Sequence, residues 1–429
     1  MIWYQKKAYL DDYIDRISDL PRNVIGNILQ YLPIQEQVRT SILSRKWRHK
    51  WASAPQLEFN GNFFEKCHES GVDSSSLVTE VLLLHNGPLH KCTFYLPPIY
   101  YKPVREECIS KWILFLARKG VKVLELENIG EDTYQTPSHV FSCHDLTYLH
   151  LGSFILSTVP NFHGFKSLVD LNLYYMKFES CAFECLVSGC PSLLKLTIYH
   201  CSGLEDFYVS SALKSLHIED DEVIKSICLK QTQNLASITL LANGLGDEID
   251  REWVTDLFKD LSKLERLSLG TAYIEILSAG VGINLQVLLK DVKHLELKGV
   301  NFIEARELFF IIHLLESCSN LEKLVIKNNS EAVETQQISK EFDCINCKFN
   351  KLLTLDMTVK TSYKPALDFT RFVLANSPAF KKLTFKVGLD LNQSNAPILL
   401  SISQDLLQME RASPRSQVKF LHGARLCYF

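Results

Sequence analysis

The sequence feature that most constrains the fold is a hexamer in which the first, fourth and sixth positions are apolar. Eleven copies begin, 20 to 31 residues apart, at Val121, Leu146, Leu168, Leu193, Leu213, Leu235, Leu264, Val292, Leu321, Leu352 and Phe380. VTEVLL from Val78 and LHKCTF from Leu89 fit as degenerate earlier copies. Each copy predicts a short parallel strand, because alternating apolar positions place one row of side chains on one face. Repetition at this period predicts a solenoid whose units stack on their neighbours.

The segments between the hexamers predict returning helices. Apolar residues at i, i+3, i+4 and i+7 begin at Ile109, Phe183, Val254 and Leu308, which is the spacing of an amphipathic helix. The uneven hexamer spacing predicts irregular convex segments. Small polar residues also keep a fixed register to the hexamers, namely Cys143, Cys190 and Cys318 before them and Cys201 and Asn329 after them. We expect Cys201 and Asn329 to hydrogen-bond the turning backbone inside the stack.

Residues 15–51 predict three short helices. Leu20-Pro21 opens the first with Asp19 as a candidate N-cap, and Pro33 ends it, because proline suits a first turn and restricts the residue before it. A second helix carries Ile34, Val38 and Ile42, and a third, capped by Ser44, carries Trp47 and Trp51. So many apolar rows exceed what a unit this small buries by itself. A partner surface or the following domain must cover the remainder.

Three motifs together resemble the plant F-box/FBD/leucine-rich-repeat family. DRIS-LP-x-x-V-I-x-x-IL-x-x-LP, followed by TSILSRKWRHKW and the strand-like LEF, resembles an F-box, and the hexamers carry the leucine-rich-repeat signature. DFTRFVLANSPAFKKLTF and DLLQMERASPRSQVKFL resemble the FBD module. The expected fold is α/β: a tail at 1–12, a three-helix F-box at 13–60, a curved solenoid with a parallel strand layer at 61–342, and an FBD module with a C-terminal tail at 343–429.

The F-box resemblance implies docking on the Skp-type adaptor of a cullin–RING ubiquitin ligase. The positions that match the family's adaptor-contacting pattern are Leu20, Pro21, Ile25, Ile28, Leu29, Leu32, Pro33, Val38, Leu43, Trp47 and Trp51. Some of them must hold the helices together instead, and the sequence leaves the two roles unsorted.

The resulting hypothesis is a substrate-recognition subunit of an SCF-type E3 ubiquitin ligase without an active site of its own. A protein substrate would lie on the concave strand face, at the outward positions Tyr148, His150, Tyr174, Tyr199, His217, Arg266, His294 and Lys323. Exposed polar residues are also what any soluble repeat needs. Two alternatives stay open: a non-ligase interaction scaffold, and a small-molecule F-box receptor using the basic strip of Lys323, Lys327, Lys382 and Lys386. The FBD module would either bind a partner or cap the solenoid.

Composition and motifs give no support to other classes of function. With 46 Lys plus Arg against 49 Asp plus Glu, whole-chain charge favours no nucleic-acid partner. The basic cluster Arg45, Lys46, Arg48, His49 and Lys50 is interpreted as the solvated face of a helix. Cys344 and Cys347 form a lone C-x-x-C without a second ligand pair, so no metal or cofactor is expected. No catalytic motif, secretory signal or membrane-spanning run is found, and thirteen scattered cysteines favour the reducing cytoplasm or nucleus.

Overall fold

The computed structural model describes residues 17–98, 103–130, 134–158, 162–204, 207–224, 226–229, 232–245, 254, 261, 263–279, 289–328, 347–360, 363–389 and 395–423. The predicted tail at 1–12, Asn329, Cys344 and two members of the helix predicted from Val254 lie outside these residues. The chain forms two compact units, Met1–Ser192 and Leu193–Phe429.

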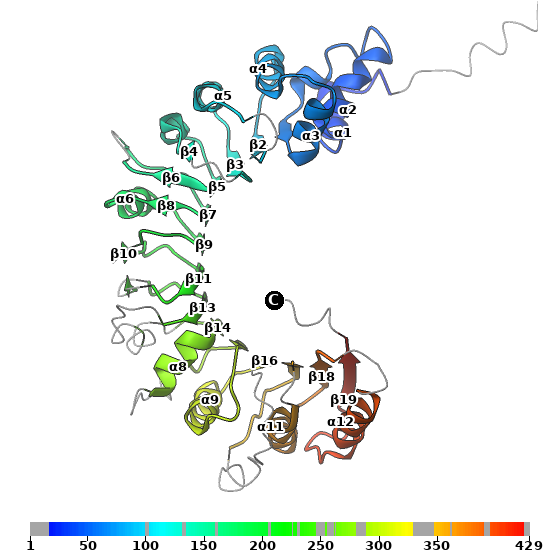
Figure 1. Ribbon diagram of the computed structural model, residues 1–429, viewed down its shortest axis with the longest axis vertical. Helices are drawn as coiled ribbons and strands as arrows, with labels where there is room; N and C mark the ends of the chain where they lie inside the picture. The colour runs from blue at the N-terminus through cyan, green and yellow to red at the C-terminus, as the bar shows by residue number, and fades with distance from the viewer. Residues whose placement is uncertain are drawn as a thin grey trace, which may run out of the picture. The chain divides into compact units, whose positions relative to one another are not determined.

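The first unit carries parallel strands along its inner side and helices or short strands behind them (Figure 1). The parallel strands, in spatial order, are β1 (Gln56–Phe59), β2 (Lys91–Leu96), β3 (Val123–Asn128), β5 (Tyr148–Gly152) and β7 (Asp170–Tyr174). The returning segments include α3 (Gly61–Glu69), α4 (Ser74–Leu84), α5 (Glu106–Lys119), η3 (Ser138–Ser142) and α6 (Ala182–Ser188). A small outer sheet joins β4 (Tyr134–Gln135), β6 (Phe154–Leu156) and β8 (Lys177–Phe178).

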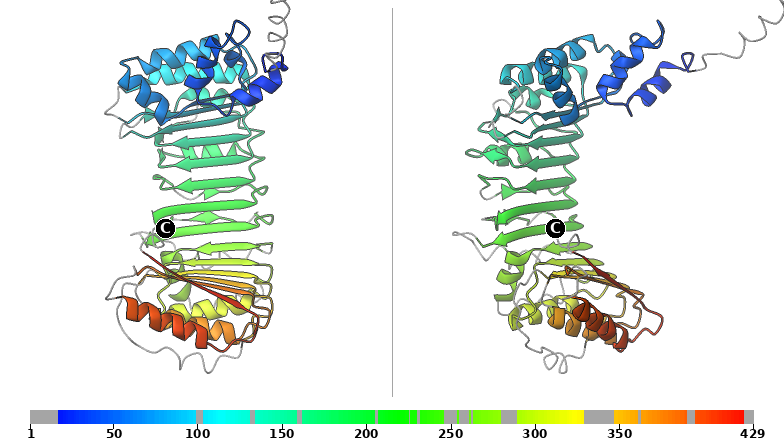
Figure 2. Two further views of the ribbon diagram at one scale, coloured as in Figure 1. Left: turned by 90° about the vertical axis from the view of Figure 1, so that its right-hand side faces the viewer. Right: turned by 45° about the vertical axis from the view of Figure 1, so that its right-hand side comes forward.

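The second unit repeats this layering, with its helices behind the strands (Figure 2). Its parallel strands, in spatial order, are β9 (Lys195–Tyr199), β11 (Ser215–Glu222), β13 (Ser237–Gly244), β14 (Arg266–Leu269), β15 (His294–Lys298), β16 (Lys323–Asn328), β17 (Thr354–Val359), β18 (Lys382–Val387) and β19 (Gln417–His422). The described helices are α8 (Thr271–Ala279), α9 (Ala305–Ser317), α11 (Tyr363–Ala375) and α12 (Ala396–Gln408). An outer pair joins β10 (Phe207–Tyr208) to β12 (Ile227–Cys228).

The hexamer predicts the strand layer correctly. Every one of the eleven copies forms a parallel strand that begins at its third position, and LHKCTF forms β2 in the same register. VTEVLL was a wrong prediction, because it lies in helix α4. Asp73 caps that helix by accepting a hydrogen bond from the Ser76 N–H at 3.3 Å, and Val78, Val81 and Leu82 are buried at helical spacing.

The first, fourth and sixth hexamer positions build a continuous core in each unit. Leu146, Leu149 and Leu151 of one repeat are fully buried, and the positions between them face the other side of the sheet. Cys201 bonds the turning backbone as predicted, since its Sγ donates to the Tyr199 carbonyl at 3.5 Å. Cys190 Sγ also donates, to the Leu186 carbonyl at 3.2 Å. Burial raises the pKa of the Cys143, Cys190 and Cys318 thiols to about 12, so these side chains serve as small neutral donors.

The FBD motif residues are used inside the second unit. Ser377 is fully buried and its hydroxyl donates to the Val373 carbonyl at 2.6 Å, which closes the end of α11. Arg411 donates to the Ser416 and Leu406 carbonyls at 3.1 and 3.3 Å, so it ties the end of α12 to the loop before β19. These hydrogen bonds give the motif residues a structural role inside the module.

Candidate functional site

The F-box segment of the first unit consists of two α-helices followed by tight turns. Helix α1 spans Arg22–Leu29 and α2 spans Ile34–Arg39, after which come η1 (Thr40–Ile42) and η2 (Trp51–Ser53). Two local predictions differ from the structure. Asp19 does not cap α1, because the helix begins only at Arg22 with Pro21 at the N-cap position. The Asp19 carboxylate pairs with Lys46 Nζ at 2.6 Å. The third predicted helix is a run of turns that ends in η2 rather than an α-helix.

Four of the residues expected to contact an adaptor are buried within the chain. Ile25, Leu29, Trp47 and Trp51 form the interior of the F-box. Trp47 Nε1 donates to Ser18 Oγ at 2.6 Å in this interior, which satisfies a polar group that burial would otherwise penalise. Their position in the structure is that of core residues.

Other residues of that set face solvent. Pro21, Ile28, Leu32, Pro33 and Leu43 are exposed, and Leu20 and Val38 are half-buried. Three further exposed apolar residues were missed by the sequence analysis: Ile17, Tyr31 at 84% exposed and Ile42 at 85%. Ile42 was assigned to a helical row with Ile34 and Val38, but the chain tightens into η1 there, which leaves both Ile42 and Leu43 outside.

The exposed turn before α2 is held by hydrogen bonds. Gln37 is buried, and its Nε2 donates to the Leu32 carbonyl at 2.9 Å. The Leu32 N–H donates to the Leu29 carbonyl at 2.9 Å. The exposed side chains of Tyr31 and Leu32 therefore project from an ordered turn, which lowers the entropy cost of binding a partner there.

The F-box is joined to the first repeats through backbone pairing and close packing. Strand β1, which is the LEF segment of the F-box, pairs in parallel with β2. His85, at the end of α4, contacts the Ala54 carbonyl through Nε2 at 2.8 Å. A Cβ on Gly87 would lie 2.7 Å from the Ser53 backbone, so only glycine fits at this junction between the F-box and the first repeats.

The outward positions of the first unit's strands are acidic and rich in tyrosine. They include Glu58, Glu125, Glu127 and Asp170 against Lys91, with Tyr95, Tyr148 and Tyr174 beside them. Lys91 pairs with Glu125 at 2.7 Å. Burial, followed by the charges of Glu125 and Asp170, raises the pKa of Tyr148 to about 12. Its phenol therefore remains a neutral hydrogen-bond donor.

Gly152 lets the Glu127 side chain pack directly against the backbone of this face. A Cβ there would meet Glu127 Cγ at 2.6 Å, and Gly152 is the register partner of Tyr174 on the next strand. The His150 ring lies 4.9 Å from the Tyr174 ring, and its Nε2 lies 3.4 Å from Glu127. Tyr148, His150 and Tyr174 thus come together on neighbouring strands of the first unit.

The other predicted substrate residues lie on the strand face of the second unit. Tyr199 packs its ring 4.5 Å from His200, and His217 Nε2 lies 3.5 Å from Glu219. Arg266, His294 and Lys323 are register partners on β14, β15 and β16. The structure therefore divides the eight predicted residues between two surfaces of different charge.

The basic cluster of the F-box is largely a solvated surface. Arg45, Lys46, Arg48 and His49 are exposed, and Lys50 is half-buried. Lys46 is neutralised by Asp19. Among the described residues, the hollow that this cluster lines contains no Phe, Tyr or Trp, which are side chains on which single-stranded nucleic acid stacks.

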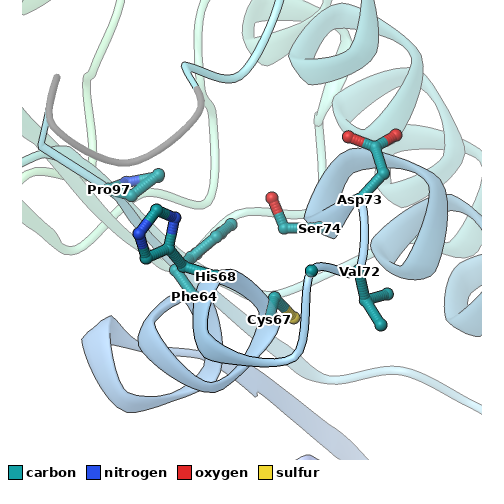
Figure 3. Close-up of a pocket in the computed structure, with 8 residues that line it drawn as sticks. Phe64, Cys67, His68, Val72, Asp73, Ser74 and Pro97 are labelled. Carbon is teal, nitrogen blue, oxygen red and sulfur yellow. The ribbon is translucent and has the colours of Figure 1, made fainter.

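A cavity of about 170 Å³ brings Cys67, His68 and Asp73 together at the turn between α3 and α4 (Figure 3). These are the residue types of a cysteine nucleophile, but their arrangement does not activate the thiol. Burial raises the pKa of Cys67, and the Asp73 charge raises it further. The His68 ring lies beside Pro97, and the sulfur points away from it. A neutral, unassisted thiol is a poor nucleophile.

In the described part of the second unit, one cluster of three side chains could contact a cation. Ligand atoms of His200, Asp220 and Asp221 lie within 4.8 Å of one another. Asp221 is exposed, and three groups fall short of the coordination that Zn²⁺ or Ca²⁺ takes from a built site.

The chain is similar to known proteins over nearly its whole length. Residues 17–57 match the F-box domain, and residues 109–326 match the family described as FBD-associated F-box protein At5g56370, LRR repeats. The F-box/FBD/LRR-repeat protein At1g13570 of Arabidopsis thaliana is 32% identical over 422 residues, covering 95% of this chain and 98% of that protein.

The chain belongs to the F-box/FBD/LRR-repeat family. A second Arabidopsis relative, F-box/FBD/LRR-repeat protein At2g04230, is 33% identical over 219 residues, which is 48% of each chain. F-box/LRR-repeat protein At3g03360, also from Arabidopsis, is 24% identical over 369 residues, covering 74% of this chain and 72% of that one. The family membership and the α/β solenoid expected from the sequence are confirmed. Within the described residues, no helix combines the length and apolarity needed to span a bilayer.

Proposed function

We propose that this F-box protein is the substrate-recognition subunit of an SCF-type E3 ubiquitin ligase. Its F-box would dock on the Skp-type adaptor and, through it, reach the cullin and the RING protein. Its strand faces would hold a protein substrate. Ubiquitin transfer would follow from proximity, because a bound lysine meets the charged ubiquitin carrier at high effective concentration. This role asks for no catalytic group in the chain itself.

The observation that carries the proposal is the set of apolar residues that the F-box leaves uncovered. Tyr31, Leu32, Ile42 and Leu43 are exposed, although the same segment has its own buried interior around Trp47 and Trp51. Exposed large apolar side chains held on ordered turns are typical of protein-binding surfaces. We assign docking to the exposed members of the predicted set and internal packing to Ile25, Leu29, Trp47 and Trp51.

The attachment of the F-box to the first repeats supports the proximity mechanism. Strand β1 and the His85 contact make the F-box continuous with the first unit's strand layer. A substrate held on that face would therefore keep a fixed distance from the docked adaptor, as proximity catalysis requires. The eleven cysteines among the described residues are all free thiols, which suits action in the cytoplasm or nucleus.

Copurification with the adaptor tests the docking surface. The Leu32→Ala/Leu43→Ala chain is expected to keep its circular dichroism spectrum and lose the co-expressed Skp-type adaptor. Leu400→Ala/Leu407→Ala is the matched control, because these leucines are also exposed but lie on α12. If the F-box variant stays folded and retains the adaptor at the wild-type level, this surface is not the docking site.

A further inference from the structure

The strand face of the second unit has a charge pattern that the family assignment does not explain. Outward positions of β14 to β19 hold seven cations against two carboxylates, Glu296 and Asp356. The cations are Arg266, Lys298, Lys323, Lys327, Lys382, Lys386 and Lys419. The whole chain carries a formal charge of −3, so the charge of this surface is opposite in sign to the net charge of the chain.

The charges lie in ordered rows. Strand register places Arg266, His294, Lys323 and Lys382 in one row, with Thr354 between the last two. A second row, four residues further along the strands, contains Lys298, Lys327 and Lys386. At about 3.3 Å per residue the two rows stand roughly 13 Å apart. The row between them carries Ser268, Glu296, Val325, Asp356 and Thr384.

Among the described residues, five of these seven cations have no carboxylate as an ion-pair partner. Lys323 lies 3.6 Å from Asp356 and Lys327 lies 3.2 Å from Glu296. The other five form no ion pair with any residue that the structure describes. Like charges held this close repel one another, so a bound anion would relieve the repulsion as well as form new contacts.

We propose that this face binds an acidic segment of the substrate protein in extended conformation, lying across the strands between the two rows of cations. Successive side chains of an extended peptide point to opposite sides, so alternating acidic residues would reach the two rows in turn. Glu296 and Asp356, beneath the peptide, would accept hydrogen bonds from its backbone N–H groups. This inference rests on the proposed function, because it names the class of substrate.

The same pattern favours a peptide over a nucleic acid. A nucleic-acid backbone has no N–H donors that could bond Glu296 and Asp356 beside their lysine partners, and a phosphate placed over the middle row would lie next to these two carboxylates. The outward positions of β14 to β18 also carry no Phe, Tyr or Trp on which bases could stack. Burial lowers the pKa of His294, and the neighbouring Lys323 and Arg266 lower it further, so this imidazole adds a neutral polar group to the row.

The test measures fluorescence anisotropy of a labelled ten-residue peptide of alternating Glu and Ser with the full-length chain. Saturable binding that weakens with added salt is expected, and the Gln–Ser counterpart should bind far more weakly. Lys382→Gln/Lys386→Gln should lose roughly tenfold in affinity, because two surface pairs of up to about 0.7 kcal/mol each amount to that factor. Lys382→Glu/Lys386→Glu should lose more, because the new carboxylates also repel those of the peptide.

Arg306→Glu/Lys364→Glu is the matched control, because it makes the same charge change on exposed residues of α9 and α11 behind the sheet. An equal loss in this control, or no saturable binding by the wild-type chain, would overturn the inference. A single-stranded RNA that displaces the peptide at equal charge and depends on the same lysines would also overturn it. Adaptor copurification is measured separately. A chain that retains the adaptor but does not bind the peptide contradicts this inference and not the proposed function.

Discussion

Leucine plays opposite roles in the repeats and in the F-box of this chain. In the repeats, leucines such as Leu295 and Leu297 on β15 are fully buried between the strand layer and the helices. In the F-box, Leu43 is 66% exposed, although its neighbourhood contains buried tryptophans. The hexamer leucines therefore complete a core by stacking, whereas the F-box keeps several large apolar side chains on its surface. The proposal that the F-box docks on a partner is based on this difference.

The sharpest way to test the repeat side of this comparison is Leu297→Ala. The side chain is completely buried, so its truncation should lower the free energy of unfolding by about 2–5 kcal/mol. Urea unfolding followed by circular dichroism measures the change. A loss below about 1 kcal/mol would mean that neighbouring side chains fill the cavity left by the truncation. A single repeat would then lose less stability from a truncation than the burial of its leucine implies.

His85 tests the junction between the F-box and the first repeats. Burial lowers its pKa, against the Ala54 carbonyl contact that raises it, and Lys119 lowers it further. The unfolded chain therefore takes up a proton first as the pH falls below about 6.5. Stability should drop through that range by up to about 1.4 kcal/mol per pH unit for this one group.

Urea unfolding between pH 5 and 7.5 measures this slope. His85→Gln should be less stable at neutral pH but should depend less on pH. His144→Gln changes the same residue type at an exposed position and serves as the control. If His85→Gln and the wild-type chain lose stability in parallel on acidification, the His85 contact does not cause the loss of folding stability at low pH.

The repeat fold could be predicted from sequence because its signal is local. Alternation within each of the eleven hexamers fixes which side chains enter the core, and the third position marks the start of each of their strands. The failures come where a local pattern competes with contacts made elsewhere. Val78 fits the hexamer, yet the Asp73 cap makes its segment a helix. Asp19 precedes the predicted helix, yet α1 begins only at Arg22 after Pro21, and Asp19 pairs with Lys46 from the distant turn.

The candidate surfaces were harder to predict than the fold. The F-box motif identifies its apolar residues, but the chain's own turns decide which of them are buried, so Trp47 and Leu43 end on opposite sides. The charge contrast between the two strand faces depends on register between strands. Lys298 and Lys419 join the basic face only because β15 to β19 align, and no single hexamer contains that information.

The smallest expected effect on folding belongs to Leu43→Ala, which makes in the F-box the same chemical change as Leu297→Ala in the repeats. Because Leu43 is exposed, the free energy of unfolding should change by less than about 0.5 kcal/mol. Added Skp-type adaptor should raise the unfolding midpoint of the wild-type chain by mass action, and it should raise that of the variant less. A destabilisation above about 2 kcal/mol without adaptor would show that the chain covers Leu43 itself. The contrast between the two regions would then fail at the residue on which the docking proposal most depends.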